Sequence, residues 1–180
     1  MGGKLVYKDT PRYECLIEMG KLFPDMDPSS CQAFLNLIKT TDDVWRIINQ
    51  HFADHGIAQG RFLVLMLLIE KSDLDYPCPA TPAEIADMAN VSRATVTGLL
   101  DTLEKDGFIS RTPDANDRRV TSIEITDAGR EFMAKILPPH FRILNHIMKP
   151  LTAKERTTFV DILTKISAHV EATQDEIKAL

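Results

Sequence analysis

The fold is decided by residues 81–126, which read TPAEIADMANVSRATVTGLLDTLEKDGFISRTPDANDRRVTSIEIT. The stretch opens with TPAE (81–84), a capping box in which threonine and glutamate stand three residues apart and proline takes the first helical position. These signals predict a short helix that ends at about Met88. Asn90 follows, and asparagine tolerates the left-handed backbone that a tight turn between two helices commonly requires.

A second helix is predicted from Ser92, a residue suited to the N-cap, to about Asp106. One side of this helix carries apolar residues at helical spacing: Val96, Leu99, Leu100 and Leu103. A different side carries Arg93, Ala94, Thr97 and Asp101. The helix therefore has one face for the core and another for solvent or a partner.

A β-hairpin is predicted after Gly107. Residues 108–111 and 119–125 are β-branched or partly alternating runs, and the turn-rich residues 113–117 separate them. Two short helices, a tight turn and a hairpin with an arginine-bearing tip together make a winged helix-turn-helix.

This arrangement predicts DNA binding, because a helix fits the major groove while a hairpin reaches the adjacent minor groove. In the helix that starts at Ser92, free backbone amides attract phosphate, and we expect DNA contacts from Ser92, Arg93, Ala94, Thr95 and Thr97. In the hairpin we expect contacts from Asn116, Arg118 and Arg119, with Asp117 bracing one of the two arginines. The sequence leaves open which arginine enters the groove.

Longer amphipathic helices flank this unit. Asp27-Pro28 signals the start of a helix that should stop at Gly56, and a nearly all-apolar helix follows over roughly 58–71. After the hairpin, Thr126-Asp127 caps a long helix that Pro138-Pro139 should bend or break near Leu137. A capping box at 152–155 opens the last helix, while the first residues, to about 26, form an extension with room for one short helix.

The expected fold is mainly α with a small β-hairpin wing. We expect an N-terminal extension and dimerisation helix at 1–56, a winged helix-turn-helix DNA-binding domain at 57–126, and C-terminal dimerisation helices at 127–180.

The 180 residues are 44% hydrophobic and 26% charged, an ordinary globular composition. The longest apolar run, 62–69, is too short for a membrane span, and the N-terminus shows no signal-peptide pattern, so we expect a cytoplasmic protein.

The overall charge argues against a nucleic-acid partner, because the net charge is -5 and the pI is about 5.5. Between residues 92 and 119 there are five basic and five acidic residues, so the charge count is neutral there too. The positions of these charged residues along the chain nevertheless favour DNA binding. Arg93 stands at the start of its helix, whereas the acidic residues Asp101, Glu104 and Asp106 gather at the far end.

Five pieces of the chain, taken in order, resemble signature motifs of MarR-family regulators: TPAEIA (81–86), SRATVT (92–97), LEKDG (103–107), NDRR (116–119) and ITDAGR (125–130). The resemblance covers about residues 34–170, and ILPPH (136–140) is similar to the subgroup that represses multidrug-efflux operons. It implies an obligate dimer built from the first and the last two helices. It also implies wings in the minor groove, and small, often aromatic, acids that bind between the dimer and DNA-reading parts to release DNA. Gly98 departs from the family pattern, since many members carry a longer, often basic side chain there.

We therefore predict a ligand-responsive transcriptional regulator that binds a pseudo-palindromic operator as a homodimer. The resemblance to the family implies that it is a repressor. It would need no cofactor or metal, and the sequence shows no nucleophile elbow, phosphate loop or metal triad that would indicate an enzyme. The alternative is a winged-helix protein-interaction module that does not read DNA.

The candidate residues for the effector pocket are Trp45, Phe62 and Met66, which are more often core residues than ligand contacts, together with His51 and Arg61. His51 and His55 stand one helical turn apart, but no third metal ligand is evident, which favours a solvated helix end. The three cysteines, Cys15, Cys31 and Cys78, have the irregular spacing of free thiols in a reducing cytosol, and no basic neighbour marks one as a redox sensor.

Overall fold

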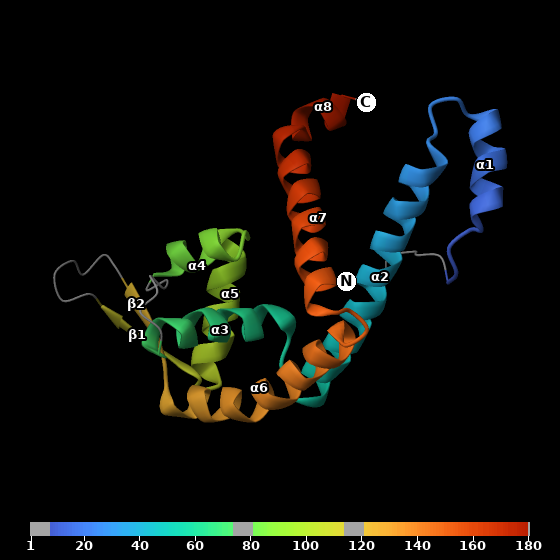
Figure 1. The fold of residues 1–180 in the computed structure, drawn as a ribbon. Coiled ribbons are helices and arrows are strands. Elements are labelled where there is room, and N and C mark those ends of the chain that lie inside the picture. Colours follow the sequence, from blue (N-terminus) through green and yellow to red (C-terminus); the bar gives the residue numbers. More distant parts are fainter. Residues whose placement is uncertain (1–7, 74–80, 114–120, 180) are drawn as a thin grey trace. The chain divides into compact units, whose positions relative to one another are not determined.

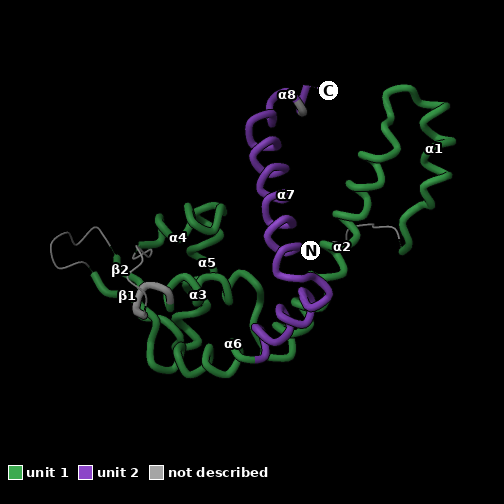
Figure 2. Tube along the Cα trace, in the orientation of Figure 1, with its two compact units in different colours: residues 1–138 green, residues 139–180 purple. Residues whose placement is uncertain are grey.

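The computed structural model describes residues 8–73, 81–113 and 121–179 (Figure 1). Its elements are α1 (Tyr13–Leu22), α2 (Pro28–Asp54), α3 (Gln59–Asp73), α4 (Pro82–Met88), α5 (Arg93–Lys105), β1 (Ile109–Pro113), β2 (Thr121–Ile125), α6 (Asp127–Met148), α7 (Ala153–Ala172) and α8 (Gln174–Ala179). The chain falls into two compact units, residues 1–138 and 139–180 (Figure 2), and the boundary lies inside α6. The mainly helical fold with one small hairpin is confirmed.

The predicted helix starts are confirmed by their side-chain caps. The Asp27 carboxylate accepts hydrogen bonds from the backbone of Ser29 and Ser30, which together with their hydroxyls lower the pKa of Asp27 to about 2. Thr81 and Thr152 each form the complete capping box with the glutamate three residues on. Local chemistry of this kind ties a helix start to one residue, because the cap satisfies backbone amides that have no partner inside the helix.

The core of the first unit lies where α3, α4, α5 and the hairpin meet. The side chains buried here include Val64, Leu65 and Leu68 from α3, Ile85 from α4, Val96, Leu100 and Leu103 from α5, and Ile123 from β2. The apolar side of α5 therefore packs as predicted, except that Leu99 is only half-buried. A Cβ at Gly60 would lie 3.2 Å from Leu99 Cδ2, so α3 and α5 approach each other closely there.

The hairpin pairs β1 with β2 antiparallel, from Ile109 opposite Ile125 to Pro113 opposite Thr121. We call this hairpin, residues 109–125, the wing. The sequence predicts Pro113 in the turn and a second strand that begins at Arg119. In the structure Pro113 ends β1, which a two-stranded sheet tolerates because proline's missing N–H can face away from the partner strand. Ile109, Ile123 and Ile125 face the core.

The helix α6 runs through both prolines as one helix from Asp127 to Met148, so of the two predicted alternatives the break near Leu137 is wrong and the bend stays a prediction. Proline's fixed φ is itself helical, and each proline removes only one backbone hydrogen bond. Met133 and Ile136, both buried, anchor the turn before the prolines. Burial of this turn opposes the cost of the two prolines, each of which removes a backbone hydrogen bond and crowds the carbonyl four residues earlier.

None of the described helices is by itself long and apolar enough to cross a membrane. The helix α2 and the part of α3 up to Ile69 meet the length and composition criteria only when taken together, across a bend of 80°.

Candidate nucleic-acid interface

The helix-turn-helix consists of α4, a turn and α5. The turn residue Asn90 has φ +50°, the left-handed conformation that its sequence position predicted. Ser92 is the N-cap of α5, and its hydroxyl accepts a hydrogen bond from the backbone N–H of Thr95 at 3.1 Å. The turn and the cap together fix where α5 begins relative to α4.

Three hydroxyls that we expected to read DNA already have partners within α5. The Ser92 and Thr95 hydroxyl oxygens lie 2.8 Å apart, and the Thr97 hydroxyl donates to the Arg93 carbonyl at 2.9 Å. A hydroxyl that already donates its hydrogen bond can still accept one through its lone pairs, and threonine also offers a methyl group. Thr97 can therefore accept a hydrogen bond from a base or touch a thymine methyl, but it has no proton left to donate.

Arg93 differs from these hydroxyls, because it is exposed and its side chain forms no hydrogen bond or ion pair with the residues that the structure describes. It is the first residue of α5, beside the free amides of the first turn. Ala94 and Gly98 are also exposed, and a Cβ built at Gly98 would meet nothing within 4 Å. The outward surface of α5 therefore begins with a cation and continues with small residues.

The acidic residues at the other end of α5 are held by arginines from other elements. Arg111 of β1 lies 2.6 Å from Asp101 and 3.5 Å from Glu104, and Arg61 of α3 lies 2.8 Å from Asp106. The sequence did not reveal these pairs, since they join residues 7, 10 and 45 positions apart that lie on different secondary-structure elements. Arg111, counted in the sequence as a free positive charge, is neutralised.

The predicted contacts at the wing tip, Asn116, Asp117, Arg118 and Arg119, lie outside the described residues, as does Cys78. The described strands place only the root of the wing, next to α5.

The candidate effector residues occupy different surroundings. Phe62 is buried and stacks at a tilt on Phe52, with ring centroids 4.6 Å apart, whereas Trp45 is 40% exposed. Arg61 also donates to the Gly56 carbonyl at 3.4 Å, besides its ion pair with Asp106. Met66 is half-buried on α3.

His51, the remaining candidate, is buried, and its ring centroid lies 4.6 Å from that of His55. The His55 Nδ1 donates to the His51 carbonyl at 2.8 Å. Within the described ranges, no three His, Cys, Asp or Glu residues lie close enough together to hold a metal ion.

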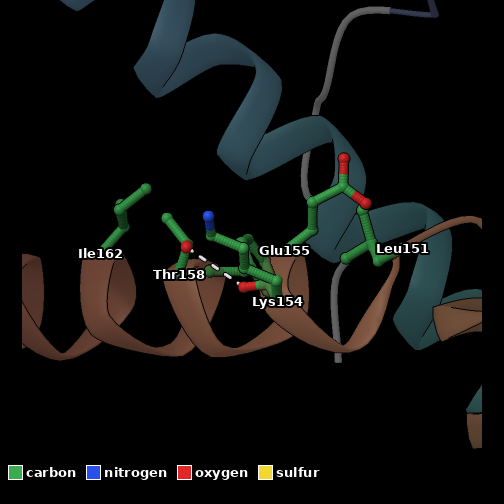
Figure 3. Close-up of a pocket in the computed structure, with 6 residues that line it drawn as sticks. Leu151, Lys154, Glu155, Thr158 and Ile162 are labelled. Atoms are coloured by element: carbon green, nitrogen blue, oxygen red, sulfur yellow. Dashed lines mark hydrogen bonds between the residues drawn. The ribbon is translucent and has the colours of Figure 1, made fainter.

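The second unit carries a groove of about 340 Å³ on one side of α7, lined by Leu151, Lys154, Glu155, Thr158, Phe159 and Ile162 (Figure 3). The Glu155 carboxylate accepts hydrogen bonds from the Thr152 backbone and hydroxyl, which lower the pKa of Glu155. Since that carboxylate is occupied with capping, the groove presents mainly apolar side chains.

Comparison with known proteins places these features in a wider group. A family model described as MarR family matches residues 59–121. The transcriptional repressor YetL of Bacillus subtilis is 32% identical over 168 residues, which span 93% of this chain and 98% of YetL. The transcriptional repressor MprA of Escherichia coli is 27% identical over 128 residues, spanning 71% of this chain and 70% of MprA.

The fold is also found among solved structures. BpsR of Bordetella bronchiseptica, whose DNA binding is regulated by 6-hydroxynicotinic acid, superposes with a TM-score of 0.62 at 22% identity. The match covers 76% of this chain and 98% of BpsR. At this level of identity, the likeness shows that the two proteins share a fold.

Proposed function

The chain belongs to the MarR family of transcription regulators, and on that premise we propose that it is a ligand-responsive repressor that binds a pseudo-palindromic operator as a homodimer. Its relatives and its fold are those of transcription regulators rather than enzymes. The proposal assigns DNA binding to residues 57–126 and dimerisation to the helices on either side.

The charge layout of α5 is the observation that carries the proposal. Its first residue, Arg93, is a cation without an ionic partner among the described residues, while two arginines pair with the acidic residues at the far end: Arg111 with both Asp101 and Glu104, and Arg61 with Asp106. A phosphate near the start of α5 therefore meets a positive side chain and free amides, and the paired carboxylates repel it less than free ones would. This local arrangement answers the objection raised by the net charge of -5.

A second copy of the chain is the proposed partner of α7. This helix of 20 residues has no buried residue, and apolar side chains recur along it at helical spacing: Phe159, Ile162, Ile166 and Val170. A continuous apolar stripe of this kind marks a protein-protein interface. A two-fold dimer also presents two copies of α5, one from each protomer, and a pseudo-palindromic operator has two half-sites to receive them.

The proposed effector is a small aromatic acid. The support comes from the family and from BpsR, whose DNA binding responds to 6-hydroxynicotinic acid. Trp45, His51, Arg61, Phe62 and Met66 remain the candidate contacts, although Asp106 would have to share or release Arg61 before a ligand carboxylate could bind it.

The ILPPH stretch (136–140) makes a multidrug-efflux operon the proposed target class.

A binding titration tests this function. The full-length protein is used to select duplexes from a random-sequence pool, and its affinity for a selected duplex is compared with that for a scrambled one at several salt concentrations. We expect a clear preference for the selected duplex and an affinity that falls steeply with salt. Equal, salt-insensitive retention of both duplexes would instead favour a winged-helix protein-interaction module.

A further inference from the structure

Arg111 joins the wing to the far end of α5. It stands in β1, where its Nη2 lies 2.6 Å from Asp101 Oδ1 and its Nη1 lies 3.5 Å from Glu104 Oε2. Asp101 and Glu104 are neighbours on the helix surface, so one forked guanidinium reaches both carboxylates. The Arg111 side chain is only 29% exposed and its Nε is buried. The arginine therefore lies back against α5 rather than extending into solvent.

We propose that Arg111 is a positioning residue for DNA binding: through Asp101 and Glu104 it fixes the root of the wing against α5, and it does not itself contact DNA. The inference rests on the proposed function, because it concerns how two DNA-binding elements keep their spacing.

The need for such a link follows from the wing itself. An isolated two-stranded hairpin is marginally stable, so its direction depends on what holds its base. Ile109 and Ile125 hold the first paired position in the core, and Arg111 opposite Ile123 adds a polar link two residues further along the hairpin. The link ends on α5, the same helix that begins with Arg93. The major-groove and minor-groove elements are thereby tied directly to each other.

Removal of the two carboxylates should weaken DNA binding, although simple electrostatics predicts that it should tighten binding. Asp101 and Glu104 are negative charges on the helix expected to lie in the groove, so their removal alone should tighten DNA binding. If they instead hold Arg111 in place, their removal should weaken binding, because the wing loses its link to α5.

The experiment compares the full-length protein with three variants: Asp101→Asn/Glu104→Gln, Arg111→Met, and the triple combination. Affinity for the selected duplex is measured over a range of salt concentrations, well below the thermal unfolding midpoint of each variant. Glu124→Gln serves as a control, because Glu124 is exposed on β2, and no hydrogen bond or ion pair joins its side chain to the described residues.

We expect the carboxylate variant and Arg111→Met each to weaken binding by about threefold to tenfold, in keeping with a partly exposed ion-pair network. The triple variant should bind no worse than either, because both changes break the same link. The slope of log Kd against log salt should be the same for Arg111→Met as for the unsubstituted protein, since Arg111 neutralises no phosphate. Glu124→Gln should not weaken binding.

Tighter binding by the carboxylate variant would overturn this proposal but not the proposed function. A salt slope lowered in Arg111→Met by about 1.8 would do the same, because a homodimer would then lose one phosphate contact from each of its two protomers, at about 0.9 each. If Arg111→Met does not fold, the sign of the carboxylate variant decides. Failure of the unsubstituted protein to prefer any duplex would overturn the proposed function, and this inference with it.

Discussion

At Gly129 the first turn of α6 passes too close to Phe108 to admit a side chain. A Cβ there would lie 2.3 Å from the Phe108 carbonyl oxygen and 2.8 Å from Ile125 Cγ1. Thr126 holds this approach, because its hydroxyl donates to the Gly107 carbonyl at 2.7 Å and accepts from the Gly129 N–H at 3.1 Å. We expect Gly129→Ala to lower the free energy of unfolding by about 1–3 kcal/mol, measured by urea denaturation. An alanine variant as stable as the unsubstituted protein would contradict this close approach.

Gly98 is the opposite case, because its Cβ would enter open space on the outward side of α5. Gly98→Ala should raise the free energy of unfolding by about 1 kcal/mol, since glycine is a poor helix former, and it provides the matched control for Gly129→Ala. The sequence identified Gly98 as a departure from the family. It could not show that the position is free of neighbours, because that depends on the packing of other elements.

Gly98→Arg tests whether this open surface faces DNA. If it does, the new guanidinium should tighten binding to DNA of any sequence and steepen the salt dependence by about 0.9 for each additional phosphate that it neutralises. An unchanged salt slope would mean that position 98 does not reach a phosphate. The measurement is the same titration over salt, with Gly98→Ala as the uncharged control.

At the scale of elements, the sequence predicted what depends on neighbours along the chain. The caps at Asp27, Thr81, Ser92 and Thr152 lie one residue before their helices, as predicted, because a cap is a local hydrogen bond. The arginine links of α5 were not predicted, since they join elements distant in sequence. For α6 the sequence left open a bend or a break at the prolines, and the structure excludes the break. The predicted contacts at the wing tip stay predictions.

The N-cap of α5 gives a test at this scale. Ser92→Ala removes the acceptor for the Thr95 N–H and should lower the free energy of unfolding by about 1 kcal/mol. Ser92→Asp restores an acceptor and should recover stability, but it also places a negative charge where we expect phosphate. We therefore expect Ser92→Asp to be stable and yet to bind DNA more weakly than Ser92→Ala. Equal DNA affinities would argue against phosphate near the start of α5.

At the scale of the whole molecule, the proposed dimer depends on α7. Ile166 is 43% exposed on the apolar stripe, so Ile166→Glu should leave the fold of one chain intact while placing a charge in the interface. We expect light scattering to show a monomer, and DNA affinity to fall because one half-site is lost. Thr164→Glu adds the same charge on a different side of α7 and should remain dimeric. A dimeric Ile166→Glu variant would show that α7 does not form the interface.

If α5 enters the DNA groove with Arg93 leading, Arg93→Met should lower the affinity for the selected duplex. The control is Arg142→Met, which removes the same charge from an exposed position on α6. We expect Arg93→Met to weaken binding by about tenfold or more, because each protomer loses its bond to a phosphate or a base, and Arg142→Met to leave binding nearly unchanged. Equal affinities for the two variants, with both folded and dimeric, would show that Arg93 does not contact DNA.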